Sequence, residues 1–194
     1  MLVIGNNTVV AIYNGDVNYT DSSNSRNFTV NRTVSKVNVT ATNVTYGNLS
    51  EITVTVPKAQ TGFVRIVVNA TNINVTVEIV NGTARFNTTK LNVGTYNVTV
   101  TYLGDEVYLP NTNVTAFTVS KAELPVNVIA QNVTVKDNTS FIIKVPEDFK
   151  GLVNITVATN TYIGSPDTLI EMARLPAGKY TAHVTFFNDT NYKV

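Results

Sequence analysis

Side chains that could do chemistry are few in this chain of 194 residues, and they are scattered along it. Cysteine is absent, and His183 is the single histidine. A lone imidazole provides neither a set of metal ligands nor a partner for acid–base catalysis. Without a thiol, the most readily activated side-chain nucleophile is also missing. We therefore expect a protein that is not an enzyme and that carries no cofactor.

One acidic residue does recur in a fixed setting. Asp16, Asp105 and Asp189 occupy equivalent positions of a repeated segment, and Glu106 adds a second carboxylate in one copy. Calcium takes about six to eight oxygen ligands, so Asp105 and Glu106 are only a weak candidate for a metal site. The alternative is a turn in which the aspartate accepts hydrogen bonds from its own backbone. The sequence favours the turn.

The repeated segment organises the whole chain. It begins Tyr-x-Gly-Asp-x-x-Tyr and ends Phe-Thr-Val at residues 13–30, and it recurs 89 positions later at residues 102–119. A third and shorter copy occupies residues 186–192. Past residue 151 the last copy is five residues shorter, so its offset becomes 84. A chain built from one repeated unit is organised as an array.

The register of the repeat divides the chain into three parts. Residues 1–33 correspond to the last two strands of a preceding module, 34–121 to a complete module, and 122–194 to a module that lacks its last strand. We therefore expect a fragment of a longer protein, with targeting and anchor segments outside it. The unmatched ends also predict head-to-tail self-association, in which Asn27–Val30 of one molecule adds to the open edge of another.

Composition and periodicity predict an all-β fold. Asn, Thr and Val dominate the chain, and the β-branched residues favour strands. The pair Asn81-Gly82 separates two alternating runs and predicts a type I′ hairpin. No helix is expected, and Ser165 to Ala173 is the least strand-like stretch. In the complete module the predicted strands are 37–39, 52–56, 64–68, 75–79, 84–86, 96–102 and 117–119, enough for a sandwich of two sheets.

Charge and hydropathy argue against two classes of partner. The net charge is +1 without a basic arm or face, so nucleic acid is not an expected partner. No apolar run approaches the length of roughly 18 residues that a membrane-spanning helix needs. The absence of cysteine is compatible with an extracellular location, because a module of about 90 residues can hold a core without disulfides.

Two segments, 91–98 and 175–182, share the pattern Leu-x-x-Gly-x-Tyr. The pattern resembles the tyrosine corner of immunoglobulin-like domains, where a tyrosine near the start of the sixth strand bonds back to the backbone. Tyr96 and Tyr180 are therefore expected to be buried structural residues whose hydroxyls bond to the preceding connection. The chain lacks the cysteines and tryptophan of antibody domains.

The closing segment of the repeat is similar to that of bacterial-type Ig-like repeat domains. The Asn-, Val- and Thr-rich background resembles the adhesin-like surface proteins of methanogenic archaea. This resemblance implies tandem immunoglobulin-like β-sandwich modules without a disulfide, displayed at the cell surface for adhesion and carrying no catalytic residues. The third copy departs from the pattern, with Asn188 in place of the glycine and no final strand.

Asn-x-Ser/Thr acceptor sites occur 17 times, about threefold more often than composition predicts. One explanation is geometric: in Asn97-Val98-Thr99 the valine faces the core, so the two polar residues share the outer face. The other is a heavily glycosylated protein. Both place the chain outside the cell or on its surface. The candidate glycosylated residues are Asn38, Asn43, Asn74, Asn97, Asn132 and Asn154.

Two functions remain open at this level. The first is a structural stalk, in which neighbouring modules of the same protein are the partners. The second is binding of glycan or of a cell-surface protein by loops at one end of the sandwich. Tyr19 and Tyr108 are the candidate binding residues for the second function, although their recurrence in register favours packing within the module.

Overall fold

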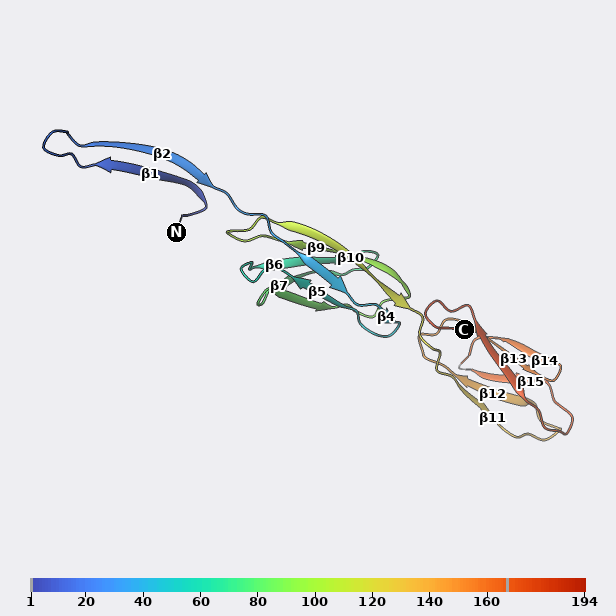
Figure 1. The fold of residues 1–194 in the computed structure, drawn as a ribbon. Helices are drawn as coiled ribbons and strands as arrows, with labels where there is room; N and C mark the ends of the chain where they lie inside the picture. Colours follow the sequence, from blue (N-terminus) through green and yellow to red (C-terminus); the bar gives the residue numbers. More distant parts are fainter. Residues whose placement is uncertain (1, 167) are drawn as a thin grey trace. The chain divides into compact units, whose positions relative to one another are not determined.

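The computed structural model describes residues 2–166 and 168–194 (Figure 1). All regular elements within these residues are β-strands, and they include no helix of the length and apolarity that a membrane span requires. The chain folds as two compact units. The first contains the residues up to Thr42, Glu51–Thr88 and Tyr96–Phe117, and the second contains Asn43–Ser50, Thr89–Thr95 and Thr118–Val194.

A β-hairpin begins the chain (Figure 1). Strand β1 (Gly5–Tyr13) pairs antiparallel with β2 (Ser22–Val30), with Gly5 opposite Val30. Strands β9 (Gly94–Tyr102) and β10 (Asn111–Ser120) are neighbours in their sheet and start 89 positions after β1 and β2. The side chains of β1 and β2 are almost all exposed, whereas every second residue of β9 from Tyr96 on is buried. The repeat therefore reproduces the strand boundaries but not the burial.

The complete repeat, residues 34–121, forms the expected sandwich of two sheets. One sheet has the order β3-β5-β8, and the other has the order β4-β10-β9-β6-β7, with β4 parallel to β10. The seven predicted strands are present, and β4 is an addition whose two residues are too few to show a period. The remaining bounds are β3 (Asn38–Ala41), β4 (Val44–Thr45), β5 (Glu51–Thr55), β6 (Phe63–Val68), β7 (Asn74–Glu78) and β8 (Thr83–Asn87).

Strand β10 closes the core of this repeat. Its side chain Phe117 is 1% exposed and stacks on Tyr96, with ring centroids 5.5 Å apart and planes at 23°. Val119, two positions further on the same face, is buried as well. Burial of a phenylalanine side chain is worth roughly 1.5–3 kcal/mol, so the last strand is a substantial part of the core.

The turn at Asn81-Gly82 has the predicted backbone conformation. Both residues have positive φ, 49° and 75°, as a type I′ turn requires. Val80 and Thr83 exchange both backbone hydrogen bonds across it, at 2.9 and 3.0 Å. The hairpin is nevertheless short, because β7 and β8 then enter different sheets. The turn thus carries the chain from one layer of the sandwich to the other.

The last repeat, residues 122–194, forms two three-stranded sheets with orders β11-β12-β15 and β14-β13-β16. The stretch with the weakest strand pattern, 165–173, contains β15, because Ile170 and Met172 are buried in the core there. Asp167, in the same stretch, lies outside the described residues. The bounds are β11 (Asn127–Ala130), β12 (Thr139–Lys144), β13 (Leu152–Val157), β14 (Asn160–Gly164), β15 (Leu169–Met172) and β16 (Ala182–Phe187).

The tyrosine of the last repeat differs from our expectation. Tyr96 is 9% exposed, but its counterpart Tyr180 is 40% exposed. The Tyr180 hydroxyl donates a hydrogen bond to the carbonyl of Pro176 at 3.0 Å, so the link to the preceding connection is present. The expected burial was wrong for Tyr180, because no described residue covers its ring as Phe117 covers Tyr96.

Gly82→Ala should destabilise the complete repeat. A Cβ at this position would lie 2.7 Å from the carbonyl oxygen of Val56, and the left-handed backbone alone costs alanine roughly 1–2 kcal/mol. Thermal unfolding followed by circular dichroism should show a lower melting temperature. Gly47→Ala is the control, because Gly47 also has positive φ but no atom lies within 4 Å of the place its methyl group would take. Equal losses in the two variants would contradict the steric argument.

Candidate functional site

The recurring aspartate shapes the same loop in all three copies. Asp105 Oδ1 accepts hydrogen bonds from the backbone N–H groups of Val107 and Tyr108, at 2.8 and 2.7 Å. Asp16 and Asp189 each accept from the N–H groups two and three positions on, at 2.7 to 2.9 Å. This is the geometry of an aspartate that stabilises a turn through its own backbone.

The second carboxylate oxygen ties this loop to another part of the same repeat. Asp105 Oδ2 accepts from the backbone N–H and the hydroxyl of Thr61, at 3.0 and 3.2 Å. Asp189 Oδ2 accepts from the backbone N–H of Lys150 at 2.8 Å, and Lys150 lies 89 positions after Thr61. Burial alone would raise the pKa of Asp105, but the N–H groups of Thr61 and Tyr108 outweigh it and hold that pKa well below its usual range.

These bonds bear on the candidate calcium site. The oxygens of Asp105 already face N–H and O–H donors. Glu106 stands where the other two copies have Val17 and Thr190, so no second carboxylate recurs with the aspartate. Within residues 2–166 and 168–194, no three His, Asp or Glu side chains gather closely enough to hold a metal ion. The arrangement around Asp105 therefore serves the turn.

The segment that enters each repeat is bound by the same loop. Ala122 N–H donates to the carbonyl of Asn191 at 3.0 Å, and its own carbonyl accepts from Lys193 N–H at 2.8 Å. Thr33 makes the same pair of bonds with the loop that follows Asp105. Each repeat thus begins by pairing in parallel with its own aspartate loop.

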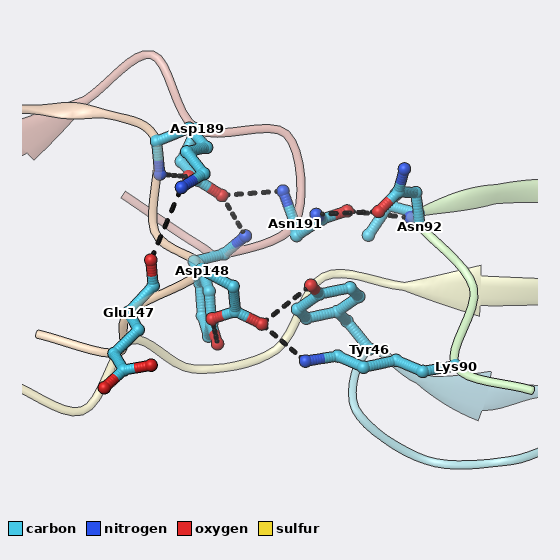
Figure 2. Close-up of polar contacts among 10 residues, drawn as sticks. Tyr46, Lys90, Asn92, Glu147, Asp148, Asp189 and Asn191 are labelled. Carbon is cyan, nitrogen blue, oxygen red and sulfur yellow. Dashed lines mark hydrogen bonds and ion pairs between the residues drawn. The ribbon is translucent and has the colours of Figure 1, made fainter.

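A second carboxylate, Asp148, gathers side chains from distant segments within the second unit (Figure 2). Its Oδ2 accepts a hydrogen bond from the hydroxyl of Tyr46 at 2.9 Å and forms an ion pair with Lys90. Its Oδ1 accepts from the hydroxyl of Tyr192 at 2.8 Å. Tyr46 and Lys90 belong to loops of the complete repeat, and Asp148 and Tyr192 belong to the last one. We call these four residues the Asp148 cluster.

Ring packing supports the Asp148 cluster. The rings of Tyr46 and Tyr192 meet edge to face, with centroids 5.4 Å apart and planes at 81°. The ammonium group of Lys90 lies 4.4 Å from the centroid of the Tyr46 ring, within range of a cation–π attraction. Phe149 flanks Tyr192 at a centroid distance of 6.2 Å. The buried ring of Tyr192 thus holds its hydroxyl toward the carboxylate.

Asn191 provides a further polar link beside the cluster (Figure 2). Its side-chain oxygen accepts from the backbone N–H of Val93 at 3.0 Å, and its amide nitrogen donates to the side-chain oxygen of Asn92 at 3.1 Å. Asn191 follows Asp189 by two residues, so the turn made by the recurring aspartate presents this amide. The turn within the repeat therefore also positions a contact to loop 89–95.

Charge and burial set the protonation of the Asp148 cluster. The ammonium of Lys90 and the hydroxyl of Tyr192 lower the pKa of Asp148 to about 2. Burial and the neighbouring carboxylate raise the pKa of Tyr192 to about 12. The pKa of Lys90 is raised, chiefly by its bond to Asp148. All three groups keep their bonding protonation state at neutral pH.

Sequence reasoning missed the Asp148 cluster because it does not repeat. In the register of the repeat, Ala59 stands where Asp148 stands, and Val135 stands where Tyr46 stands. A search for recurring residues passes over such positions. The signal that could have found Asp148 is a charged residue where the complete repeat has alanine, three positions before a glycine that occurs in both repeats as Gly62 and Gly151.

The candidate binding tyrosines are in different environments. Tyr19 is 70% exposed at the tip of the first hairpin, Tyr108 is half-buried, and their counterpart Tyr192 is buried in the Asp148 cluster. The three share one backbone bond to the recurring aspartate. His183 is exposed on β16. The tyrosine therefore recurs because its backbone N–H takes part in the turn. The surroundings of its ring differ from copy to copy with the residues that lie beside the turn.

The candidate glycosylation residues lie mostly on the outside. Asn97 and Thr99 are exposed while Val98 between them is buried, as the alternation of a strand requires. Asn154 is half-buried, between buried neighbours of β13. The exposed candidates are Asn38, Asn43, Asn74, Asn97 and Asn132.

Asp105→Asn should lower the stability of the complete repeat. The substitution places an NH₂ group or a neutral oxygen opposite the N–H and O–H donors of Thr61, so a charge-assisted bond is lost at a cost of roughly 1–3 kcal/mol. Urea unfolding followed by circular dichroism would measure it. Glu106→Gln removes the same charge one residue away and should leave the midpoint unchanged. A drop of equal size in both variants would contradict the role given to Asp105.

The stabilisation from Asp148 should depend on pH. Its pKa lies near 2 in the folded chain against a usual 3.8, so its contribution is complete above about pH 4 and is lost as pH falls toward 2. We expect Asp148→Asn to melt below the natural chain at neutral pH, with the gap closing near pH 2. Glu147→Gln, a matched change whose side chain points away from the cluster (Figure 2), should show no such gap. A gap that stays constant with pH would refute the assignment.

Comparison with known proteins agrees with the fold. Residues 37–120 match the family model described as a bacterial Ig-like domain (group 3). No curated protein matches the chain. The matched segment includes all eight strands of the complete repeat, from β3 to β10, in the two-sheet arrangement described above. The segment 37–120 is therefore a bacterial Ig-like domain of group 3.

Proposed function

We propose that this chain is a non-catalytic structural segment of an adhesin-like surface protein, in which Ig-like repeats form a stalk that holds an adhesive part away from the cell. The observation that carries the proposal is the Asp148 cluster. It joins two loops of the complete repeat to the last repeat within one compact unit. A spacer needs such bonds, because a freely jointed chain of domains does not hold its two ends at a fixed distance.

The bonds involved suit this role. Each repeat has its entry segment paired with its own aspartate loop, so little free chain remains between one repeat and the next. Lys121, at the boundary, donates to the carbonyl of Asp189 at 2.7 Å. A linker that is bonded in this way differs from the Gly- and Ser-rich segments that let domains move independently.

Surface location is the second part of the proposal. Bacterial Ig-like domains are commonly extracellular, and the excess of Asn-x-Ser/Thr sites on outward strand faces suits a glycosylated surface protein. The Asn-, Val- and Thr-rich background adds the resemblance to adhesin-like proteins of methanogenic archaea. Exposed glycans on these faces would also block edge-to-edge pairing of strands.

One observation favours a binding function instead. The tip of the first hairpin, residues 14–21, encloses a shallow hollow of about 500 Å³ beside the exposed ring of Tyr19. Exposed aromatic rings are a usual element of glycan and protein recognition. The corresponding ring in the last repeat, Tyr192, is instead packed against Tyr46, and this difference leads us to place the stalk first.

Nuclear spin relaxation should test the stalk. Backbone amides of 43–50 and of 139–172, which belong to one compact unit, are expected to report one common rotational correlation time in the natural chain. In Asp148→Ala, with the carboxylate gone, the two sets should report different and shorter times. Glu147→Ala serves as the control and should match the natural chain. Independent tumbling of the two sets in the natural chain would overturn the stalk.

A glycan array and intact cells would test the binding alternative. The stalk predicts no retention of the 194-residue chain on either. Retention that is lost in Tyr19→Ala and kept in Val17→Ala, a still more exposed neighbour on the same tip, would instead establish the hairpin as a binding element.

A further inference from the structure

Three buried side chains of the complete repeat have polar atoms without a hydrogen-bond partner among the described residues. These atoms are the hydroxyl of Ser35, the amide oxygen and nitrogen of Gln60, and the hydroxyl of Tyr102. The three residues are 2%, 1% and 0% exposed, so they lie beneath the surface. A buried polar group without a partner is unfavourable by roughly 1–3 kcal/mol, and native proteins seldom contain one.

The loop of the recurring aspartate brings Gln60 and Tyr102 to the same end of the sandwich. Thr61, next to Gln60, donates its backbone N–H and its hydroxyl to Asp105, which follows Tyr102 by three residues. Burial, and to a smaller extent the carboxylate of Asp105, raise the pKa of Tyr102 to about 12. The geometry between this hydroxyl and the carboxylate is nevertheless too poor for a hydrogen bond, so the hydroxyl needs another partner.

Ser35 reaches the same end from the segment that enters the repeat. Asn111, at the start of β10, donates its side-chain N–H to the carbonyl of Ser35 at 2.8 Å. Tyr102 is the last residue of β9, the neighbour of β10 in the sheet. The hydroxyl oxygens of Thr101 and Thr112 lie 3.1 Å apart across these two strands, so the adjacent residues Tyr102 and Asn111 also lie side by side.

The last repeat has apolar side chains at the same positions. In the register of the repeat, the counterparts of the three polar residues are Leu124, Phe149 and Phe186. The rings of Phe149 and Phe186 meet edge to face, with centroids 5.9 Å apart and planes at 88°. The counterparts of Gln60 and Tyr102 are therefore in direct contact, and that contact requires no hydrogen-bond partner.

The polar version of this place suits water. Serine and glutamine are smaller than the leucine and phenylalanine at the equivalent positions, so they fill less of the space. A water molecule takes up about 30 Å³ in the liquid and needs two to four polar partners. The hydroxyls and the amide of Gln60 include both donors and acceptors, as water does. A cation fits less well, because it would meet the NH₂ group of the amide and would need about six oxygen ligands.

We propose that the complete repeat binds ordered water between Ser35, Gln60 and Tyr102, at the place where the last repeat has a direct aromatic contact. The water accepts from the NH₂ group of Gln60 or from a hydroxyl, and it donates to the remaining oxygens. It thereby satisfies the buried amide next to the bonds between Thr61 and Asp105. This inference concerns the interior of one repeat and is independent of the proposed stalk.

A crystal structure of the 194-residue chain provides the first test and needs no variant. At a resolution that shows ordered water, a water molecule should lie within hydrogen-bond distance of the Gln60 amide and of the hydroxyl of Ser35 or Tyr102. A Gln60 amide that bonds directly to protein groups, without water beside it, would overturn the proposal.

Magnetic relaxation dispersion of the water nuclei tests the site in solution, because it counts water molecules that stay in the protein for longer than the protein takes to rotate. Gln60→Met keeps the length of the side chain but removes both polar atoms, so the number of long-lived water molecules should fall by one or more. Gln131→Met is the matched control, because Gln131 is exposed, and it should leave that number unchanged. An equal number in the natural chain and in a folded Gln60→Met would contradict the site.

Discussion

The ring of Phe117 stacks on Tyr96 at the point where the last strand of the complete repeat joins the sheet. On one side of that strand lies β9 and on the other β4, so the same strand completes both the core and the hydrogen-bonded ladder. A sandwich without this strand has an apolar face and an unpaired backbone edge at once. In the last repeat no described residue takes the place of Phe117, and the ring of Tyr180, the counterpart of Tyr96, is 40% exposed.

Three aspartates show that repeated and unique contacts have different roles. Asp105 and Asp189 bind backbone groups inside their own repeats, and their bonds recur at equivalent residues. Asp148 instead binds side chains from other loops, and its position is alanine in the complete repeat. Bonds to backbone groups can form in every copy of the module, whatever its side chains are. The side-chain contacts of Asp148 instead depend on the particular residues of these two neighbouring repeats. Such unique contacts allow otherwise similar repeats to hold a specified order.

Much of the fold could be predicted because its signals are local. The alternation of Val and Ile with Asn and Thr located the strands of the complete repeat, and Asn81-Gly82 located a turn with positive φ at both residues. Predictions based on longer-range consequences were less successful. The turn at Asn81-Gly82 joins strands of two different sheets and not the two strands of one hairpin. Strand β4 is too short to show an alternation of apolar and polar residues. Strand β15 forms in a stretch whose alternation is weak, because Ile170 is buried by its neighbours.

By itself the sequence determined the strands, the length of the repeat and the turn at each recurring aspartate, because these depend on neighbouring residues and on a pattern that is copied along the chain. Tertiary structure alone decided which side chains meet: that Tyr46 and Lys90 share Asp148, and that Tyr180 is exposed where Tyr96 is buried. Those outcomes depend on which residue of a distant segment packs against each side chain. The residue pattern of one segment does not identify that partner.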